Sequence, residues 1–404
     1  MRSATDMITS QYPAYPEDVF SSEALKRPFG HYRRIRDLGP VVRLKGVEAV
    51  ALSRFDDVRT ALQTPEIFIS GEGNGFNDVW NMPKGPELIR MDGQEHRRLR
   101  RHLTQPMTPA ALAQHRDMLK TMITNQVRKL ADGNTFEAIE GIAKHLPLAA
   151  ISYLVGLPEA GRQNMLRWAT AIFNMVGPAS PALNEDLQIL LEFRDYMLSV
   201  DPAQLPENGW AKALFDAARD GKLTVAEAQA VLGGFVAPSL DTTINAKSNL
   251  LYNLAINPAE WDKLRRNPSL ISSTVMEGVR HSAVVRWFAR VTSTDYQRRD
   301  IFLPQGTRVM LMFGSANRDE RHYPDPDAFK VDRNPQDQLG WGSGPHICAG
   351  LHLARLEMEV LLEALVENIE TMEADEPVFS ANRGLFGLQS LPMRMTPTGL
   401  ARAN

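Results

Sequence analysis

Apolar side chains recur about every three to four residues along most of this chain, which is the spacing of helices that bury one face. The pattern predicts a helix over residues 108–130, with a threonine cap and a proline in its first turn, and helices then dominate to about residue 282. A further helix is predicted over residues 349–372. β-branched runs predict short strands, at residues 41–44, 49–53, 291–295 and 307–313. The expected fold class is therefore mainly α with small β-sheets.

The longest helical pattern begins at Thr224, where Glu227 three residues later completes a capping box. Pro238 lies inside this pattern. An interior proline removes a backbone hydrogen bond and costs about 3 kcal/mol, so a single helix kinked at Pro238 is expected. The kink falls beside the neighbouring pair Asp241 and Thr242.

Composition and charge indicate a single globular protein. Of the 404 residues, 43% are hydrophobic and 23% are charged, which is ordinary for a globular chain, and no repeat or linker divides it. A single domain over residues 1–404 is expected. The net charge of −3 gives no reason to expect nucleic acid or anionic lipid as a partner. No apolar run approaches about 18 residues and residues 1–20 lack a signal-peptide pattern, so a cytoplasmic protein outside the membrane is expected.

The chain has one cysteine, Cys348, so an internal disulfide is impossible. It lies in a glycine-rich loop directly before the predicted C-terminal helix, where the helix dipole favours thiolate and predicts a low thiol pKa. Gly342, Gly344 and Gly350 allow the backbone to approach a flat ligand closely. A lone buried cysteine is more often inert, so its role depends on the surrounding motif.

Residues 341–350, Trp-Gly-Ser-Gly-Pro-His-Ile-Cys-Ala-Gly, resemble the haem loop of cytochromes P450, with tryptophan in the phenylalanine position. Glu277 and Arg280 resemble that family's Glu-x-x-Arg, and Arg333 ends a segment similar to its meander. Glu277 and Arg280 share a helix face and can form a buried pair if a second arginine completes the network. The resemblance implies the cytochrome P450 fold, with the iron of haem b bound by Cys348.

The resemblance also implies which side chains bind the haem propionates. His96 and Arg100 match the family's His-x-x-x-Arg and lie on one helical face because they are four residues apart. Arg290 matches the arginine that follows the Glu-x-x-Arg helix, and His346 is expected to bind a propionate from the cysteine loop. Gly350, at the end of that loop, completes the expected cofactor-binding set.

Residues 239–242, Ser-Leu-Asp-Thr, resemble the oxygen-activation sequence of the family. The resemblance implies that the Thr242 hydroxyl faces bound dioxygen and that Asp241 relays protons. Because Pro238 and Ser239 replace an Ala-Gly pair, Pro238 is expected to maintain the local helix distortion. The expected activity is a monooxygenase reaction with O₂, either hydroxylation or O-demethylation. A peroxide-driven or NO-reducing enzyme of the same fold, or a haem-based ligand sensor, remains as an alternative.

Several segments look most like a bacterial branch that oxidises para-substituted benzoic acids, which implies a small aromatic substrate. Glu72, however, stands where that branch carries a carboxylate-binding arginine, so a neutral or phenolic aromatic is expected instead. Arg286 either restores anion binding or is a supporting or surface arginine. The candidate substrate contacts are Glu72, Phe76, Phe173, Val285 and Phe386.

Electrons must come from another protein, because no fused flavin or iron–sulfur segment is visible in the sequence. The resemblance implies a ferredoxin with its ferredoxin reductase. A basic face near Arg97, Arg101 and Arg355 is the expected dock, through electrostatic steering. The alternative interpretation of Arg97, Arg98 and Arg101 is a solvated basic face that docks no partner.

Overall fold

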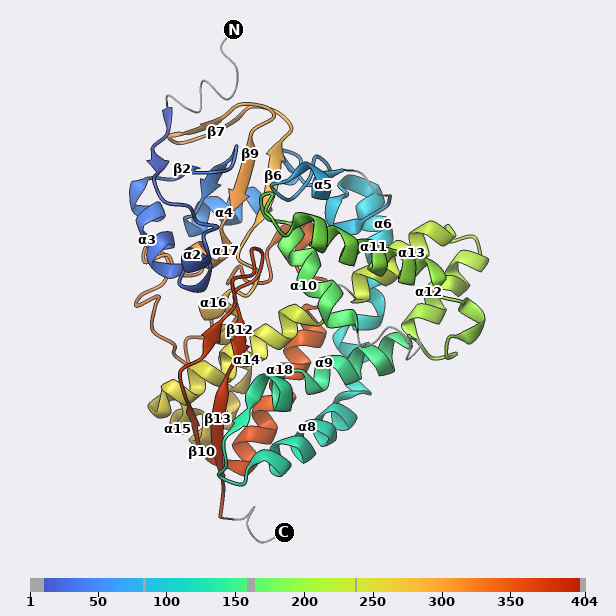
Figure 1. Ribbon diagram of the computed structural model, residues 1–404, viewed down its shortest axis with the longest axis vertical. Coiled ribbons are helices and arrows are strands. Elements are labelled where there is room, and N and C mark those ends of the chain that lie inside the picture. Colours follow the sequence, from blue (N-terminus) through green and yellow to red (C-terminus); the bar gives the residue numbers. More distant parts are fainter. Residues whose placement is uncertain (1–10, 83–84, 158–163, 237, 400–404) are drawn as a thin grey trace.

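The computed structural model describes residues 11–82, 85–157, 164–236 and 238–399, and the chain is mainly helical, as predicted (Figure 1). Residues 1–10, at the start of the segment without a signal-peptide pattern, lie outside the described residues. The helices are α2 (Ser22–Lys26), α3 (Phe29–Leu38), α4 (Phe55–Leu62), α5 (Asp78–Asn81), α6 (Gly93–Thr104), α7 (Pro109–Ala113), α8 (Arg116–Leu130), α9 (His145–Ala150), α10 (Met165–Met175), α11 (Leu183–Ser199), α12 (Trp210–Arg219), α13 (Val225–Val236), α14 (Asp241–Ile256), α15 (Pro258–Arg266), α16 (Ile271–Ser282), α17 (Phe313–Ala316) and α18 (Leu351–Asn368).

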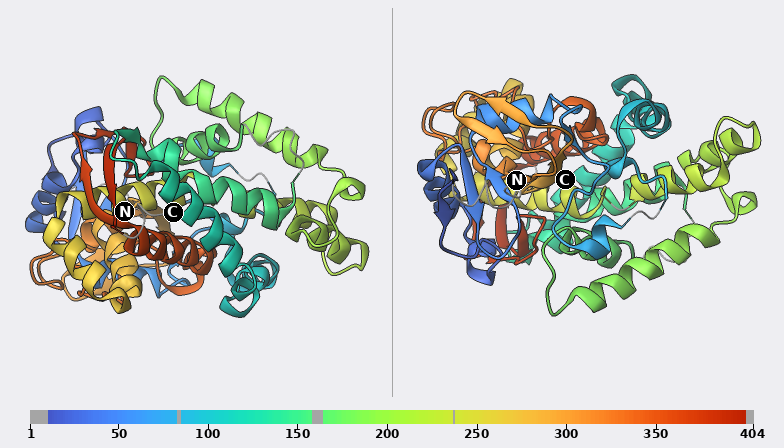
Figure 2. Two further views of the ribbon diagram at one scale, coloured as in Figure 1. Left: turned by 90° about the horizontal axis from the view of Figure 1, so that it is seen from below. Right: turned by 90° about the horizontal axis from the view of Figure 1, so that it is seen from above.

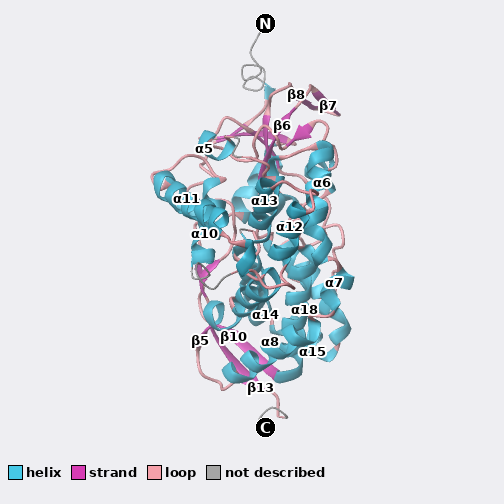
Figure 3. Cartoon of the chain, turned by 90° about the vertical axis from the view of Figure 1, so that its right-hand side faces the viewer, coloured by secondary structure: helices cyan, strands magenta, loops and turns pink. Residues whose placement is uncertain are grey.

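The strands are short and gather in two main places. They are β1 (Ala14–Tyr15), β2 (Val41–Leu44), β3 (Val50–Leu52), β4 (Phe68–Ile69), β5 (Phe136–Glu137), β6 (Phe288–Thr292), β7 (Tyr296–Arg298), β8 (Ile301–Leu303), β9 (Arg308–Leu311), β10 (Ile369–Ala374), β11 (Val378–Phe379), β12 (Leu388–Ser390) and β13 (Pro392–Pro397). A six-stranded sheet of order β1-β2-β3-β9-β6-β4 lies at one end of the molecule, and β5, β10 and β13 lie at the other (Figure 3). The helices fill the space between.

The large sheet joins strands from distant parts of the sequence. β3 runs parallel to β9, with Val50 opposite Val309, and β9 pairs antiparallel with β6, where Val309 is also opposite Arg290. This pairing fixes the predicted propionate ligand Arg290 on a rigid strand, because its neighbours on both sides are hydrogen-bonded.

Helices α14 and α18 pass through the centre of the molecule, and the main apolar core surrounds them (Figure 1). Helix α14 packs on α16 and β10, and α18 packs on α8 and α16. Helices α11, α12 and α13 extend to one side (Figure 2). Within the described parts of the chain, no helix is long and apolar enough to cross a membrane.

The predicted strands are present, with shifted ends. The first hairpin forms as expected from β2 and β3. Strand β6 begins three residues before the predicted start of residues 291–295, and β9 is shorter than predicted. Two predicted helices were too long: residues 108–130 form α7 and α8, and α18 ends at Asn368 because the chain there enters β10. The capping box at Thr224 is formed. The Thr224 amide donates to the Glu227 carboxylate at 2.8 Å, and the Glu227 amide donates to the Thr224 hydroxyl at 3.2 Å.

The prediction of one helix kinked at Pro238 was wrong, because the chain forms two helices. Helix α13 ends at Val236 and α14 begins at Asp241. Pro238 has no amide hydrogen, and its ring does not fit a continuous helix. Hydroxyl groups take over two of the free carbonyls: Ser239 donates to Phe235, and Thr242 Oγ1 donates to Pro238 at 2.6 Å. These bonds stabilise a full break at the position where a kink was expected.

Candidate active site

The loop before α18 places the only thiol of the chain at the start of that helix. The Cys348 amide donates to the Trp341 carbonyl at 2.8 Å, and Gly350 is the N-cap residue of α18. Gly342 and Gly344 both have φ of +70°, which side chains other than glycine rarely adopt. The loop is therefore a tight turn in which Cys348 is partly exposed as a residue while its thiol group points inward and is buried.

Gly344 also lies against the end of α4, where an added Cβ would overlap the carbonyl oxygen of Leu62. We expect Gly344→Ala to destabilise the protein by about 1–3 kcal/mol through backbone strain, and further through this clash. Gly306→Ala is the matched control, because Gly306 has φ of +79° but no neighbouring atom within 4 Å of an added Cβ. Thermal unfolding and haem content measure the difference. Equal losses in both variants would contradict a specific role for this contact.

The Cys348 thiol does not have the low pKa that the sequence predicted. Burial raises its pKa, and this effect outweighs the hydrogen bond from the Gly350 amide and the charge of Arg100. The start of α18 alone therefore does not produce a thiolate. A bound metal ion would do so, because coordination deprotonates a thiol.

Helix α6 brings two of the predicted propionate ligands to this loop. The imidazole of His96 stacks on that of His346 with ring centroids 4.2 Å apart, and Arg100 donates to the Ile347 carbonyl. Burial, together with the charges of His346 and Arg100, lowers the pKa of His96 to about 4, and burial also lowers the pKa of His346. Both imidazoles are therefore neutral near pH 7, and they offer hydrogen bonds rather than charge.

Asp92 belongs to this cluster, although it was not predicted from the sequence. Its carboxylate accepts hydrogen bonds from the amides of Ser70 and Gly71 and lies 3.7 Å from Nε2 of His346. Burial opposes ionisation, but the nearby His346 ring and the hydrogen bonds from these amides lower the pKa of Asp92. The carboxylate therefore orients the His346 ring. Its place directly before α6, where aspartate is common, was the available signal.

Arg290 and Arg100 are cations with no carboxylate in direct contact among the described residues, although the charge of Asp92 acts on Arg290 from farther away. Arg290 is 6% exposed, and its guanidinium donates only to the Ala289 carbonyl at 2.7 Å. Burial lowers its pKa to about 10, which leaves it charged at pH 7. In the described ranges no carboxylate lies within 4.0 Å of either guanidinium. The positive charge of Arg290 contributes to the lowered pKa of His346. Buried charges are normally paired, so this cluster fits a ligand with carboxylate groups.

One stripe of α14 is open in a way that also fits a flat cofactor. Between Asp241 and Leu251 every residue is buried except Thr242 and Ala246, which lie four apart on one face. A thiol, two cations without a carboxylate in direct contact and an open helix face together match the iron, propionates and ring of haem. The residues present therefore fit this group.

Asp241 is buried beside that stripe, at the first turn of α14. Its carboxylate accepts hydrogen bonds from Oγ1 of Thr170 at 2.8 Å and from Nδ2 of Asn245 at 3.0 Å. Burial raises the pKa of Asp241, and these bonds oppose the shift only in part. The sequence did not point to Thr170, because it lies on α10 and no local pattern links it to Asp241.

Two predicted substrate contacts, Phe173 and Val285, meet in one small apolar cluster with Val284 and Leu385. Ala246 of the open stripe packs against the same cluster. The cluster therefore joins α10, α14 and two loops next to Asp241. Small-molecule sites are mostly lined by apolar side chains of this kind.

Three other predicted contacts do not belong to this cluster. Glu72 is exposed, and only its backbone carbonyl is engaged, by Arg308. Phe76 packs against Trp287 with ring centroids 4.7 Å apart. Phe386 packs on Phe29 and Phe379, with centroids at 5.1 and 5.6 Å. Their side-chain directions are set by the turns that carry them, which sequence spacing does not reveal.

Arg286 is buried, so its interpretation as a surface arginine was wrong. Its guanidinium donates to the carbonyls of Leu25 and Leu385 and lies over the ring of Phe386, 5.4 Å from the centroid. Because these groups come from separate segments, Arg286 supports the packing behind the apolar cluster. This arrangement agrees with the predicted supporting role.

Glu277, Arg280 and Arg333 form a buried network, as the sequence predicted. Arg280 binds both oxygens of Glu277, at 2.7 and 2.8 Å, and Arg333 donates to the same carboxylate at 3.1 Å. Arg280 also donates to the carbonyls of Asn317 and Pro326, each at 2.8 Å. The network ties α16 to the segment that leads into the cysteine loop.

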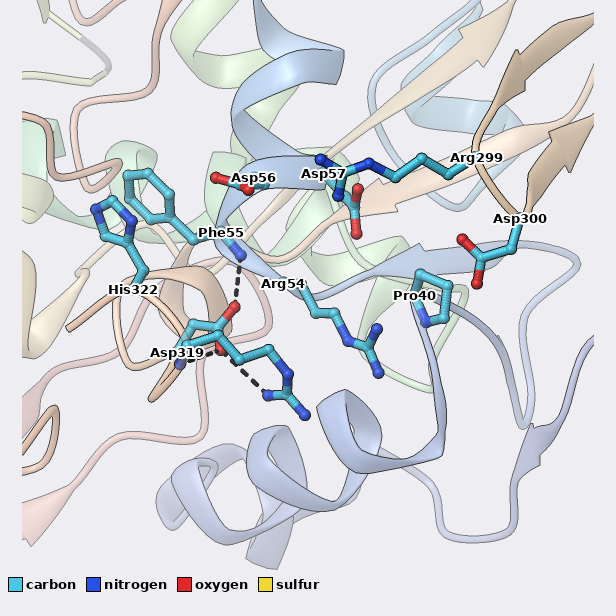
Figure 4. A pocket seen from close by; sticks show the side chains of 10 residues that line it. Pro40, Arg54, Phe55, Asp56, Asp57, Arg299, Asp300, Asp319 and His322 are labelled. Atoms are coloured by element: carbon cyan, nitrogen blue, oxygen red, sulfur yellow. Dashed lines mark hydrogen bonds and ion pairs between the residues drawn. The ribbon is translucent and has the colours of Figure 1, made fainter. Parts of the chain in front are cut away.

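A pocket of about 190 Å³ lies elsewhere on the molecule (Figure 4). Three of its charged groups have partners: Asp319 accepts hydrogen bonds from the Phe55 amide and from Arg321, and Arg54 donates to the Arg36 carbonyl. None of the predicted site residues lines it. The lining residues are Pro40, Arg54, Phe55, Asp56, Asp57, Arg299, Asp300, Asp319, Arg321 and His322.

Comparison with known proteins agrees with this geometry. A model of the cytochrome P450 family matches residues 164–397. The chain is 30% identical over 388 residues to cytochrome P450 CYP199A2 of Rhodopseudomonas palustris, covering 94% of both chains. It is also 30% identical to the beta-dihydromenaquinone-9 omega-hydroxylase of Mycobacterium tuberculosis, over 94% of this chain and 78% of that one. The crystal structure of CalO2 superposes with a TM-score of 0.82 at 25% identity, covering 95% of this chain and 99% of that one. The chain therefore belongs to the cytochrome P450 family of haem-binding monooxygenases.

Proposed function

We propose that this cytochrome P450 inserts one oxygen atom from O₂ into a small neutral or phenolic aromatic substrate, by hydroxylation or O-demethylation, with electrons from a ferredoxin and its reductase. The observation that carries the proposal is the buried Asp241 carboxylate next to Thr242 on the open stripe of α14. The proposal includes one domain over residues 1–404. It also includes a cytoplasmic location. A chain with one cysteine can form no internal disulfide, which suits the reducing cytoplasm.

Each residue of the site has a defined task in this proposal. Cys348 would bind the iron, and Gly350 leaves space beside the loop because nothing lies within 4 Å of its virtual Cβ. The cations Arg100 and Arg290 would bind the propionates, with hydrogen bonds from the neutral imidazoles of His96 and His346. When bound, haem supplies the one-electron and O₂ chemistry.

Proton movement is the task of Asp241 and Thr242. Because burial raises the pKa of Asp241, its carboxyl group can hold a proton and release it towards the open stripe. The Thr242 hydroxyl donates to the Pro238 carbonyl at 2.6 Å, which leaves its oxygen lone pairs free to accept a hydrogen bond. This acid–alcohol pair favours O₂ use over a peroxide-driven or NO-reducing reaction. NADH-dependent product formation with ferredoxin and reductase would distinguish the monooxygenase from a peroxide-driven or NO-reducing enzyme. It would also distinguish it from a haem sensor, which forms no product.

The apolar cluster around Phe173 and Val285 supports an aromatic substrate without a carboxylate. Arg286, which follows Val285 in the sequence, donates through Nε and Nη2 to backbone carbonyls, so that only its buried Nη1 has no partner among the described residues. We therefore expect 4-methoxyphenol to shift the haem spin state more strongly than 4-methoxybenzoate in a spectral titration. Tight binding of 4-methoxybenzoate would contradict this substrate class.

Carbon monoxide binding to the dithionite-reduced protein tests the thiolate ligand. We expect the red-shifted Soret band of a haem thiolate, and its loss in Cys348→Ser. A wild-type spectrum without this band would overturn the proposed iron ligation.

The surface behind the cysteine loop supports a ferredoxin dock. Ile347 is 39% exposed there and lines a depression of about 300 Å³ with Trp341, Arg59 and Arg355. An apolar centre whose rim carries two arginines beside one carboxylate, Asp337, fits a small acidic partner.

Two further basic side chains, Arg97 and Arg101, are exposed on α6, the helix that contacts this loop. We expect Arg101→Glu to raise the KM for ferredoxin by about tenfold at low salt, and less at high salt because exposed charges are screened. Arg266→Glu is the control, since Arg266 is exposed on α15. The KM is measured by steady-state kinetics at varied ferredoxin concentration. An equal change in KM in both variants would contradict the proposed dock.

A further inference from the structure

Four asparagines follow one another at four-residue spacing along α14: Asn245, Asn249, Asn253 and Asn257. The side-chain amide of each donates to the backbone carbonyl four residues earlier, at 2.8, 2.8, 2.7 and 2.8 Å. We call this row the asparagine ladder. Its first member also donates to the Asp241 carboxylate at 3.0 Å.

The ladder runs from the interior to the surface. Asn245, Asn249 and Asn253 are at most 7% exposed, whereas Asn257, at the C-terminal end of the helix, is partly exposed. Along its inner part the ladder faces the segment before β12: Asn249 lies 3.4 Å from the Phe386 carbonyl, and Gly387 leaves room for the Asn245 amide. The ladder therefore connects Asp241 with the end of α14.

Asparagine is an unfavourable choice for these positions. It costs up to about 0.7 kcal/mol relative to alanine inside a helix. A buried polar atom without a partner costs about 1–3 kcal/mol more. Apolar residues would suit the centre of the molecule better, so a fourfold row calls for an explanation other than packing.

The amide oxygens supply that explanation. No described residue donates a hydrogen bond to Oδ1 of Asn245, Asn249 or Asn253. None of these oxygens is among the buried polar atoms that lack both a partner and solvent contact. Each of these oxygens therefore keeps some accessible surface, although Oδ1 of Asn245 also lies against the Gly387 backbone. Side chains four apart on a helix are about 5–6 Å apart, which two hydrogen bonds to one bridging water would span.

We propose that the asparagine ladder binds a file of water molecules that carries protons from the surface at Asn257 to the Asp241 carboxylate. Each water accepts a proton from its neighbour on the surface side and passes one of its own protons inward. The net change is the transfer of one proton from bulk water to a carboxylate that has just released one. This inference rests on the proposed function, in which Asp241 relays protons.

The first test is structural and needs no turnover. A crystal structure of the haem-loaded protein should show ordered waters within hydrogen-bond distance of Oδ1 of Asn249 and Asn253, and Asn249→Leu should remove them. Asn249→Ser, which keeps a polar group, should retain the file. A wild-type structure with dry amide oxygens would overturn the proposal.

The second test measures proton delivery. In air, with ferredoxin, reductase and NADH, NADH oxidation should slow by about tenfold or more in Asn249→Leu, because positioned proton transfer contributes about 10²–10⁴-fold. The ratio of rates in H₂O and D₂O should also rise. Asn253→Leu should act alike, and Asn249→Ser should stay near wild type. These rates do not depend on knowing the native substrate.

Asn368 provides a matched control on α18. It is buried and donates to the Ala364 carbonyl at 2.7 Å, but its Oδ1 is occupied by Arg128 at 2.8 Å. Asn368→Ala should change stability and leave the isotope ratio unchanged. If Asn249→Leu matched Asn368→Ala in both readouts, the ladder would be purely structural and the inference wrong. If the wild type oxidised no NADH, the proposed function would fail, and the crystal waters would still decide whether the file exists.

Discussion

Replacing Lys247 by methionine is expected to lower the free energy of unfolding by about 3–5 kcal/mol, because the change leaves a carboxylate buried without its partner. The Lys247 ammonium lies 2.5 Å from Glu357, and the two side chains are only 1% and 3% exposed. Burial lowers the pKa of Lys247, so the charged state depends on the pair. Urea unfolding followed by circular dichroism gives the change in free energy.

The double variant Lys247→Met with Glu357→Leu separates pairing from packing. Two apolar side chains leave no uncompensated charge, so stability should return to the wild-type value or exceed it. Arg167→Met is the exposed control: it breaks a pair with Glu192 that is about half exposed, and should cost at most about 1 kcal/mol. If the double variant were as unstable as the single one, an uncompensated charge would not be the cause.

The Lys247–Glu357 pair also has a functional consequence. It joins α14, which carries Asp241 and Thr242, to α18, which follows Cys348. The single variant should therefore also weaken haem retention, because the two walls of the site lose their connection.

The second large effect is expected at Arg290. Arg290→Met should speed haem loss by roughly 10- to 100-fold, because a hydrogen bond to a charged group contributes about 1.5–3 kcal/mol. The protein without haem should become no less stable, since the variant removes a buried charge that has no carboxylate partner. Haem transfer to an excess of apomyoglobin measures the rate.

Arg318 is the matched control for this prediction. Its pKa is also lowered to about 10 by burial, but it has a carboxylate partner, Asp327, at 3.0 Å. Arg318→Met should therefore destabilise the protein with or without haem. Equal rates of haem loss in the two variants would argue against a propionate at Arg290.

Features set by short sequence spacing were predictable. The pair Glu277 and Arg280 and the helical face of His96 and Arg100 follow from helix geometry and were placed correctly. The break at Pro238 was not predictable, because a kink or a break depends on which groups take the free carbonyls.

Contacts between distant segments could not be read from the sequence. Thr170 with Asp241 and Lys247 with Glu357 are separated by 71 and 110 residues. Such pairs meet only through tertiary packing, and neither partner carries a local signal. The prediction of a low pKa for Cys348 was wrong for a related reason. Burial in the folded protein raises the thiol pKa by more than the amide at the start of α18 lowers it.

The mixed order of the large sheet constrains how the protein is made. Because β9 lies between β3 and β6 and is the last strand of this sheet in sequence, the platform that holds Arg290 cannot form until about three quarters of the chain has left the ribosome. Cys348 emerges later still. Contacts of such long sequence separation form slowly. Cofactor capture is therefore expected late in synthesis, and a chain arrested before residue 348 lacks the proposed ligand for the iron.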